Sequence, residues 1–320
     1  MTYYFVLFLL VFALLLVYFR LADKFNIIDK PNERSSHSKI TIRGGGVAYL
    51  IAGIAFVLYT GFTFPWFWTG FFIIAALSFV DDIKTLSSKV RLPLQLLAVL
   101  MLLYQGMQGD QSILIWFVAL IIATGIINAY NFMDGINGIT AGYSFVVLSS
   151  LLMLNQKMSF VDDAFIITFI IADVVFAFFN FRKKAKCFAG DVGSVSIAFV
   201  IVFLLLKVIM QTGNIFYILF LAVYGVDSVL TIIYRLKKRE NIFEAHRTHL
   251  YQWLVKPGPF THLQMAGIYM FIQAIISLGV ILLADASMVN QLLFSAVSLL
   301  VLAVVYISIK LNYKTKYGLV

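Results

Sequence analysis

The chain has 320 residues, of which 62% are hydrophobic and only 12% are charged, and its mean hydropathy is +0.96. This composition excludes a soluble globular protein, because no soluble domain of this size needs so much apolar surface. The 24 Lys and Arg residues outnumber the 15 Asp and Glu residues. Cytoplasmic loops of a membrane protein explain that excess better than a nucleic-acid partner does. We predict an all-α, polytopic integral membrane protein in a lipid bilayer.

Apolar stretches long enough to cross a bilayer recur along the whole chain, since a hydrocarbon core of about 30 Å needs about 20 apolar residues per helix. Nothing basic precedes the first stretch, so we predict a retained helix rather than a cleavable signal peptide. With the other stretches it makes about eleven transmembrane helices, in a single domain over residues 1–320. The expected spans are residues 3–19, 44–62, 66–80, 91–108, 112–127, 139–155, 162–180, 193–211, 214–235, 264–284 and 289–309.

Basic residues gather in every second loop. The loops that follow residues 19, 83, 180, 235 and 309 are rich in Lys and Arg, whereas the other loops carry little beyond Lys157. This bias places the basic loops in the cytoplasm, with the N-terminus outside and the C-terminus inside, as an odd number of helices requires. The polar clusters described next all lie on the cytoplasmic face.

The first basic loop contains His37 and Arg43 and ends in three glycines, Gly44 to Gly46, where the second predicted helix begins. Basic side chains beside a glycine-rich helix start can hold an anion through their charge and through backbone N–H groups. A charged loop that only follows the positive-inside rule is the alternative. We treat His37 and Arg43 as candidate substrate-binding residues.

Two adjacent carboxylates, Asp81 and Asp82, end the third predicted helix, and Lys84 follows them. At 3.6 residues per turn their side chains project about 100° apart, so the two are not expected to do the same job. One could meet a metal or act as a base while the other pairs with Lys84, Lys89 or Arg91. A helix C-terminus disfavours anions, so the pair needs a further reason; a salt-bridged cap is the alternative. Asp81, Asp82 and Lys84 are candidate catalytic residues.

Between two apolar runs the chain carries Asn128, Asn131, Asp134 and Asn137. Amides and a carboxylate in this place are costly unless they face water, a metal or a polar ligand. In a helix Asn128, Asn131 and Asp134 recur every three residues and therefore share one face. A polar loop that happens to hold amides is the alternative. We expect the three amides to bind substrate and Asp134 to take part in catalysis.

A fourth cluster places Asp191 in a glycine-flanked turn at the start of the eighth predicted helix. Mg²⁺ prefers one or two carboxylates together with phosphate oxygens and water, which suits this position. An Asp at a helix start is often only an N-cap, which is the alternative.

The last large cytoplasmic loop contains His246, Arg247 and His249. If this stretch is helical, the two histidines share a face, and with the arginine they suit a phosphate or nucleotide clamp. Zinc is not expected, because Cys187 is the only thiol and zinc needs more ligands of its own kind nearby.

Two further acids lie inside predicted helices. For Asp227 we favour a structural role, with Arg235 as an available partner, over contact with substrate. Asp173 lies in mid-helix without an evident partner.

Acids surrounded by basic residues at one membrane surface are typical of a site for Mg²⁺ and a diphosphate. A secondary transporter for an anionic solute is the alternative. Transporters more often place carboxylates near the bilayer midplane, where only Asp173 and Asp227 are candidates.

Four motifs in this order resemble those of the polyprenyl-phosphate N-acetylhexosamine-1-phosphate transferases, glycosyltransferase family 4. They are Asp81-Asp82, the segment 128–138, the segment 188–194 and the late His loop. The resemblance runs from about Pro31 to Gln252. It implies transfer of a sugar 1-phosphate from a UDP-N-acetylhexosamine to undecaprenyl phosphate, releasing UMP, at the start of cell-surface polysaccharide synthesis. It also implies a bacterial cytoplasmic (inner) membrane location and a Mg²⁺ requirement, with Mn²⁺ as an alternative ion. A homodimer is left open.

The resemblance also implies roles for single residues. Asp191 matches the Mg²⁺ ligand, and Asp81 matches the proposed base that deprotonates the lipid phosphate. Asp134 and Asn131 fall on the motif that lines the cleft. The resemblance also places His246 and His249 near the nucleotide or diphosphate and gives Lys84 the basic position after the acid pair. Direct in-line attack is preferred, and an aspartyl-phosphate on Asp81 or Asp82 is the alternative.

The late loop reads His-Arg-Thr-His, from His246 to His249. This is closer to family members that serve O-antigen and capsule assembly than to the peptidoglycan branch, which has three consecutive histidines. The departure favours a simple UDP-N-acetylhexosamine donor over a muramyl-pentapeptide one.

Overall fold

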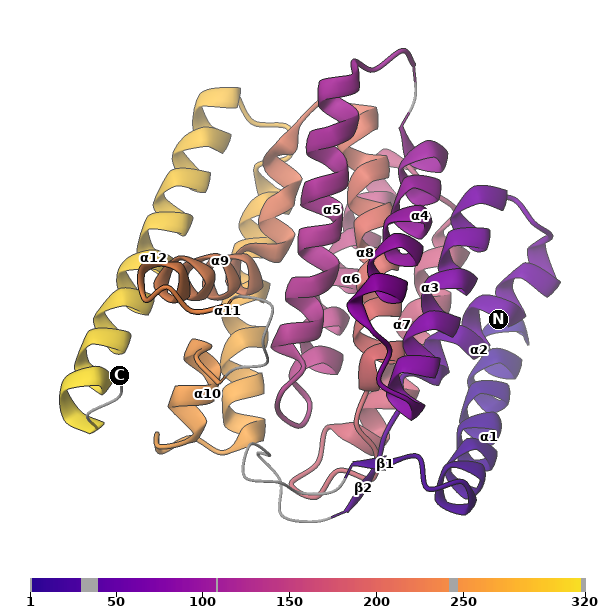
Figure 1. The fold of residues 1–320 in the computed structure, drawn as a ribbon. Helices are drawn as coiled ribbons and strands as arrows, with labels where there is room; N and C mark the ends of the chain where they lie inside the picture. The colour runs from indigo at the N-terminus through magenta and orange to yellow at the C-terminus, as the bar shows by residue number, and fades with distance from the viewer. Residues whose placement is uncertain (1, 30–39, 108, 242–246, 318–320) are drawn as a thin grey trace.

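A computed structural model describes residues 2–29, 40–107, 109–241 and 247–317. Helices make up almost all of the regular structure in these residues, and Figure 1 shows the long ones packed side by side as a bundle. Apolar segments in lipid must pair their backbone groups internally, which a helix does. The helices of the first half are α1 (Thr2–Lys24), α2 (Val47–Thr60), α3 (Pro65–Ile83), α4 (Ser88–Gly106), α5 (Ile113–Met133) and α6 (Ile139–Met158). Those of the second half are α7 (Asp163–Asn180), α8 (Gly190–Thr212), the 3-10 helix η1 (Ile215–Leu221), α9 (Ala222–Lys237), α10 (Leu250–Val255), α11 (His262–Leu282) and α12 (Met288–Tyr317).

The all-α polytopic class predicted from the sequence is confirmed, because each of the eleven predicted spans contains a helix in the described part of the chain. In that part, nine helical segments are long and apolar enough to cross a membrane. The helix α2 has only 14 residues, and α4 carries Lys89 and Arg91 in its first turn. Eleven crossings therefore remains a prediction.

The ninth predicted span differs from a plain transmembrane helix. It begins as the 3-10 helix η1 and continues as α9. Figure 1 shows α9 running crosswise to the long helices α5 and α12. The sequence between residues 214 and 235 is apolar enough to span the bilayer, but its periodicity does not reveal this change of direction.

Helix α8 lies at the centre of the bundle, with 83% of its most apolar stretch buried. Helices α3, α5, α2 and α6 pack against it. At the edge, the most apolar stretch of α12 is only 6% buried, as expected for a helix that faces lipid. The start of α8, which carries Asp191, is thereby held by the surrounding helices.

A short hairpin closes one end of the bundle. Its strands β1 (Ile28–Asp29) and β2 (Thr41–Ile42) are antiparallel, and Ile42 forms a parallel bridge with Cys187. The N–H of Phe188 donates to the carbonyl oxygen of Ile42 at 2.8 Å. The first basic loop is thus attached to the turn before α8.

Candidate active site

The two carboxylates at the end of α3 have different partners. One oxygen of Asp82 accepts from Arg43 Nε at 2.7 Å and from the backbone N–H of Asp191 at 2.9 Å. The other accepts from the N–H of Val192 at 3.0 Å. Asp82 therefore caps the positive end of α8 from a neighbouring helix, which explains an acid at the C-terminal end of α3.

Asp81 has other partners than Asp82. Its Oδ1 accepts from the backbone N–H of Leu86 at 2.6 Å, and its Oδ2 lies 3.1 Å from Arg91 Nη1. The expectation that the two acids do separate jobs, and that one pairs with a basic residue after α3, agrees with this geometry. Lys84 is the C-cap residue of α3, and its side chain is exposed. Its catalytic role stays a prediction.

Asp191, in the first turn of α8, meets the side chains of Asp81 and Asn131. Arg43 Nη2 lies 3.5 Å from Asp191 Oδ1. The side chain of Asp191 is 19% exposed. Two facing carboxylates repel each other unless a cation or a proton lies between them. One or two carboxylates, completed by phosphate oxygens and water, are the ligands that Mg²⁺ prefers. The residues present therefore fit the ion that the sequence motifs predict.

Arg43, which directly follows β2, joins this cluster. Its partial burial alone would lower the pKa of the guanidinium, but the carboxylates of Asp82 and Asp191 raise that pKa above its usual value. The side chain is still 36% exposed. Arg43 is thus a fixed cation that can also donate to an anion arriving from solvent.

The three glycines after Arg43 serve packing, which corrects one prediction from the sequence. The N–H groups of Gly45 and Gly46 donate to the carbonyls of Phe188 and Ala189, at 2.7 and 3.0 Å. A Cβ on Gly46 would overlap the Cα of Gly193. These two N–H groups are therefore engaged with the turn before α8 and do not hold an anion.

Asp134 lies at the C-terminal end of α5, and the hydroxyl of Thr140 donates to its Oδ1 at 2.6 Å. Burial raises the pKa of Asp134 to about 7, and the nearby carboxylates of Asp191 and Asp82 add to this while Thr140 opposes it. A carboxyl that titrates near neutral pH can exchange a proton during a reaction.

The amides of this motif divide into two groups. Asn128 and Asn131 lie in α5, as the helical interpretation predicts. Asn128 donates to the carbonyl of Thr124 in its own helix at 2.9 Å, whereas Asn131 reaches Asp191. Asn137 is buried and donates to the carbonyl of Arg182 at 2.9 Å. Substrate binding by Asn128 and Asn137 stays a prediction, and their contacts here are with the protein.

The late loop is only partly described. His37 and His246 lie outside the described residues, so nothing is added to their predicted roles. His249 is the N-cap of α10, with an extended backbone, so the condition of a helical stretch is not met at His249. Its side chain is 2% exposed and its Nδ1 lies 3.2 Å from Asp227 Oδ1. Arg247 is half-buried, and its substrate-binding role stays a prediction.

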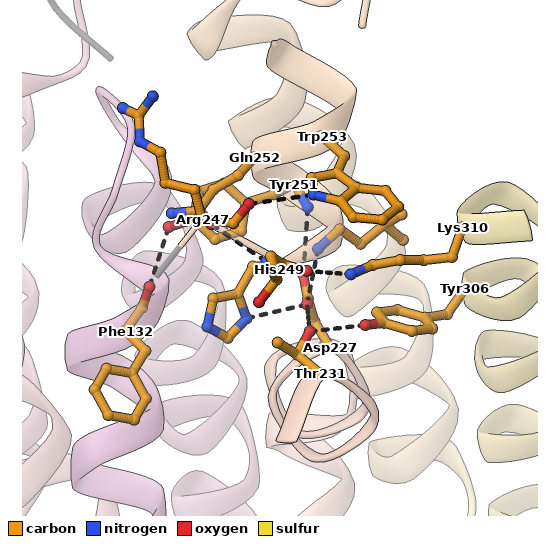
Figure 2. Close-up of polar contacts among 12 residues, drawn as sticks. Phe132, Asp227, Thr231, Arg247, His249, Tyr251, Gln252, Trp253, Tyr306 and Lys310 are labelled. Carbon is orange, nitrogen blue, oxygen red and sulfur yellow. Dashed lines mark hydrogen bonds and ion pairs between the residues drawn. The ribbon is translucent and has the colours of Figure 1, made fainter. Parts of the chain in front are cut away.

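Asp227 has a structural role, as the sequence favoured, but with other partners than expected. It accepts from Tyr269 Oη at 2.6 Å, from Thr231 Oγ1 at 3.2 Å and from the N–H of Leu250 at 3.0 Å. Figure 2 shows the carboxylate beneath the start of α10. The expected partner Arg235 instead pairs with Glu240 at 2.9 Å.

Asp173 also has a partner that the sequence did not reveal. The hydroxyl of Tyr49, on α2, donates to its Oδ1 at 2.6 Å. The side chain of Asp173, on α7, is fully buried. It therefore ties α2 to α7.

Sequence reasoning missed three residues of the site. Thr140 tunes Asp134. The hydroxyl of Tyr251 donates to the carbonyl of Phe132 at 3.0 Å. His262 Nδ1 accepts from the N–H of Asn137 at 3.3 Å. Gly135 was a signal for Tyr251, because a Cβ at Gly135 would overlap the tyrosine hydroxyl.

Comparison with known proteins identifies the family. The model of glycosyl transferase family 4 matches residues 64–209. The chain is 30% identical over 289 residues to a probable undecaprenyl-phosphate N-acetylglucosaminyl 1-phosphate transferase of Bacillus subtilis (strain 168), covering 84% of this chain and 80% of the relative. The chain belongs to glycosyl transferase family 4.

Other glycosyl transferase family 4 proteins are similar at lower identity. Undecaprenyl-phosphate alpha-N-acetylglucosaminyl 1-phosphate transferase of Yersinia pestis is 27% identical over 277 residues, with 79% of this chain and 76% of the relative covered. The protein of the same name from Escherichia coli (strain K12) is 24% identical over 274 residues, with 77% and 74% covered.

The segment matched by the glycosyl transferase family 4 model contains Asp81, Asn131, Asp134 and Asp191. These are the residues that the structure gathers around the start of α8. Arg43 lies before the matched segment and still enters the cluster. The matched segment therefore contains the acids and the amide of the polar cluster, and Arg43 is added from outside it.

Proposed function

We propose that this protein transfers an N-acetylhexosamine 1-phosphate from a UDP-N-acetylhexosamine to undecaprenyl phosphate. The products are undecaprenyl-diphospho-N-acetylhexosamine and UMP. One observation carries the proposal: Asp81, Asn131 and Asp191 meet at the start of α8, with Arg43 beside them. The relatives' names describe the same reaction type with N-acetylglucosamine. We therefore propose UDP-N-acetylglucosamine as the first donor to test.

In the proposed reaction an oxygen of the lipid phosphate attacks the β-phosphorus of the donor. The bond between that phosphorus and the bridging oxygen breaks, and UMP leaves with the bridging oxygen. Asp191 would hold Mg²⁺, which when bound supplies positive charge against the repulsion between the two anions. Arg43 can donate to a phosphate oxygen from its exposed side. Asp81 is placed beside Asp191 to accept a proton from the acceptor phosphate.

Direct attack is the mechanism that the contacts favour. Asp82 accepts from Arg43 and from two backbone N–H groups. Asp81 accepts from Leu86 and Arg91. A carboxylate engaged in this way is a weak nucleophile, because an attack on phosphorus would break its bonds. The geometry thus supports Asp82 as a positioning residue rather than as the site of an aspartyl-phosphate.

The contacts of Asp173 and Asp227 give no support to the transporter alternative. Asp173 accepts from Tyr49, and Asp227 accepts from backbone and side-chain donors around α10. A transporter of this kind would need such acids at a broken helix facing a solute. We retain the transferase as the proposal.

We further propose a multi-pass location in the bacterial cytoplasmic membrane, with the site on the cytoplasmic face. Helix α1 ends beside the hairpin next to the polar cluster, and α12 ends beside α10. Together with the basic loops this supports an outside N-terminus and a cytoplasmic C-terminus. A homodimer stays a prediction.

The test is UMP release by the protein purified in detergent. Undecaprenyl phosphate, Mg²⁺ and a panel of UDP-N-acetylhexosamines are supplied together and with each component omitted. We expect UMP only when lipid, metal and one donor are all present, and loss of release in Asp191→Asn and Asp81→Asn. The control is Asp110→Asn, an exposed acid outside the cluster, which should behave as wild type. A folded wild-type protein that releases no UMP with any donor would contradict the proposal.

A further inference from the structure

The C-terminal helix α12 contacts the rest of the protein through few side chains. Its buried residues are Gln291, Tyr306 and Lys310. Tyr306 and Lys310 are four positions apart, so they lie on one face, one turn from each other. The hydroxyls of Tyr306 and Thr231 are 2.7 Å apart, which joins α12 to α9 beside Asp227. A helix that is largely exposed to lipid thus has a polar contact with α9 in its second half, besides the one that Gln291 makes near its start.

Lys310 lies in an aromatic cage at this contact. Its Nζ lies 4.0 Å from the ring centroid of Trp253 and 4.9 Å from that of Tyr234. It also donates a hydrogen bond to the backbone carbonyl of Thr248 (Figure 2). Only 6% of the residue is exposed. A buried ammonium is costly unless aromatic faces and a carbonyl replace its water, so this arrangement needs a purpose.

A residue of the same cage holds the preceding carbonyl of the loop. Trp253 Nε1–H donates to the carbonyl oxygen of Arg247 at 3.1 Å. Lys310 therefore holds the carbonyl of Thr248 directly and the carbonyl of Arg247 through the ring that it contacts. Two consecutive peptide groups are fixed from a helix that lies more than sixty positions further along the chain.

The loop fixed in this way lies against the end of α5. The hydroxyl of Tyr251, in the first turn of α10, donates to the carbonyl of Phe132. Phe132 directly follows Asn131, the residue that reaches Asp191. Figure 2 shows Arg247 and Tyr251 between Phe132 and the contact made by Lys310. Arg247 thus lies just before the helix that is bonded to the end of α5, next to Asn131.

We propose that Lys310 is a positioning residue for donor binding: it fixes the Arg247–Thr248 backbone so that Arg247 is directed toward the diphosphate of the UDP-sugar. This inference rests on the proposed transferase function and names the part of the site that the C-terminal helix serves. Lys310 touches neither substrate nor the reacting atoms. Its effect should therefore appear in donor affinity.

The test compares Lys310→Met, which keeps the length of the stem and removes the charge, with Lys310→Arg, which can restore both the cation–π contact and the bond to a carbonyl. For Lys310→Met we expect the KM for UDP-N-acetylglucosamine to rise about tenfold, equivalent to about 1.4 kcal/mol. The kcat and the KM for undecaprenyl phosphate should stay near their wild-type values. Lys310→Arg should recover most of the affinity.

Two further variants test whether a rise in the KM for the donor comes from the contact between Lys310 and Trp253. Lys314→Met removes an exposed lysine one turn further along α12 and should leave the KM for the donor unchanged. Trp253→Phe keeps an aromatic ring under Lys310 but deletes the N–H that holds Arg247, so it should raise the same KM. An equal fall in kcat for every substrate with a lower unfolding temperature would show that Lys310 only packs α12, and would overturn the proposal.

A second readout does not depend on turnover. Hydrogen exchange of the backbone amides in residues 247–253 should speed up in Lys310→Met, while exchange in α3 stays the same. Unchanged exchange in residues 247–253 would overturn the inference even if the wild-type enzyme is active. A wild-type protein that releases no UMP would instead contradict the proposed function, and the exchange measurement would still decide the role of Lys310.

Discussion

An oxygen of the Asp82 carboxylate lies 2.9 Å from the backbone nitrogen of Asp191, although 109 positions separate the two residues. The end of α3 thereby supplies the negative charge that stabilises the start of α8. Asp191, the predicted metal ligand, takes its position from this contact. The adjacent acids at the end of α3 thus have separate jobs, since Asp81 faces the Asp191 carboxylate and Asp82 holds the Asp191 backbone.

Asp82→Asn should lower the free energy of unfolding more than Asp81→Asn does. An amide at position 82 cannot accept from all of its present donors, and each buried donor left unsatisfied costs about 1–3 kcal/mol. The Arg43 ion pair adds little, since its guanidinium is partly exposed. Thermal unfolding in detergent measures the difference. Equal stability of the two variants would contradict the capping role of Asp82.

Gly46→Ala should prevent the close packing of α2 against α8. A Cβ there overlaps the Cα of Gly193, and neither backbone can move without displacing Asp191. The matched control is Gly125→Ala in α5, where a Cβ meets no atom within 4 Å. The control should be neutral or stabilise by about 0.5–1 kcal/mol, because alanine suits a helix better. Unfolding temperatures and UMP release of the two variants are to be compared, and a Gly46→Ala protein with wild-type values would refute the packing argument.

The rate of UMP release should fall on the acid side as Asp134 takes up a proton, near its raised pKa of about 7. Thr140→Val removes the hydrogen bond that lowers this pKa, so the acid limb should move to higher pH. The control is Thr168→Val, which deletes a buried hydroxyl that bonds to Tyr3 instead. An acid limb that stays in place in Thr140→Val would show that Asp134 does not set the profile.

The raised pKa of Asp134 also makes the stability of the protein depend on pH. Because the folded pKa of Asp134 lies above the ordinary carboxyl value, its contribution to stability is fully present below the unfolded pKa and is lost as pH rises through about 7. Asp134→Asn should therefore flatten the fall in unfolding free energy between about pH 4 and pH 7. Thermal unfolding as a function of pH in detergent tests this. A slope in that window that is unchanged in the variant would contradict the shift.

Asp227→Asn should destabilise the protein by about 3 kcal/mol, as expected when a buried, fully bonded charge is removed. Its carboxylate accepts from Tyr269 and from the start of α10, and it lies 3.2 Å from the ring of His249. The control Asp285→Asn lies in the turn between α11 and α12 and should be silent. Wild-type stability in Asp227→Asn would mean that α10 does not depend on this carboxylate.

Much of the fold followed from the sequence, because apolar stretches of sufficient length have few alternatives in lipid. The grouping of Asp81, Asn131 and Asp191 could be predicted from the four ordered motifs. Local patterns could also separate Asp81 from Asp82, since adjacent helical residues point in different directions.

The remaining contacts depend on packing between segments far apart in the chain. Nothing near Arg43 in sequence indicates that it reaches Asp82, and nothing near Lys310 indicates Thr248. The glycines gave a partial signal: Gly46 and Gly193 allow close approach, but local sequence does not pair them. For His249 the sequence left open whether the stretch is helical, because i, i+3 spacing does not show where a helix begins.

The central proposal is that Asp191 holds the divalent cation at which phosphoryl transfer occurs. The most direct test is UMP release by wild type, Asp191→Asn and Asp110→Asn, with Mg²⁺ titrated at saturating donor and lipid. We predict that Asp191→Asn needs at least about tenfold more Mg²⁺ for half-maximal rate or loses activity, while Asp110→Asn matches wild type. A wild-type rate that does not depend on the divalent cation, or an Asp191→Asn titration that overlays wild type, would contradict the claim.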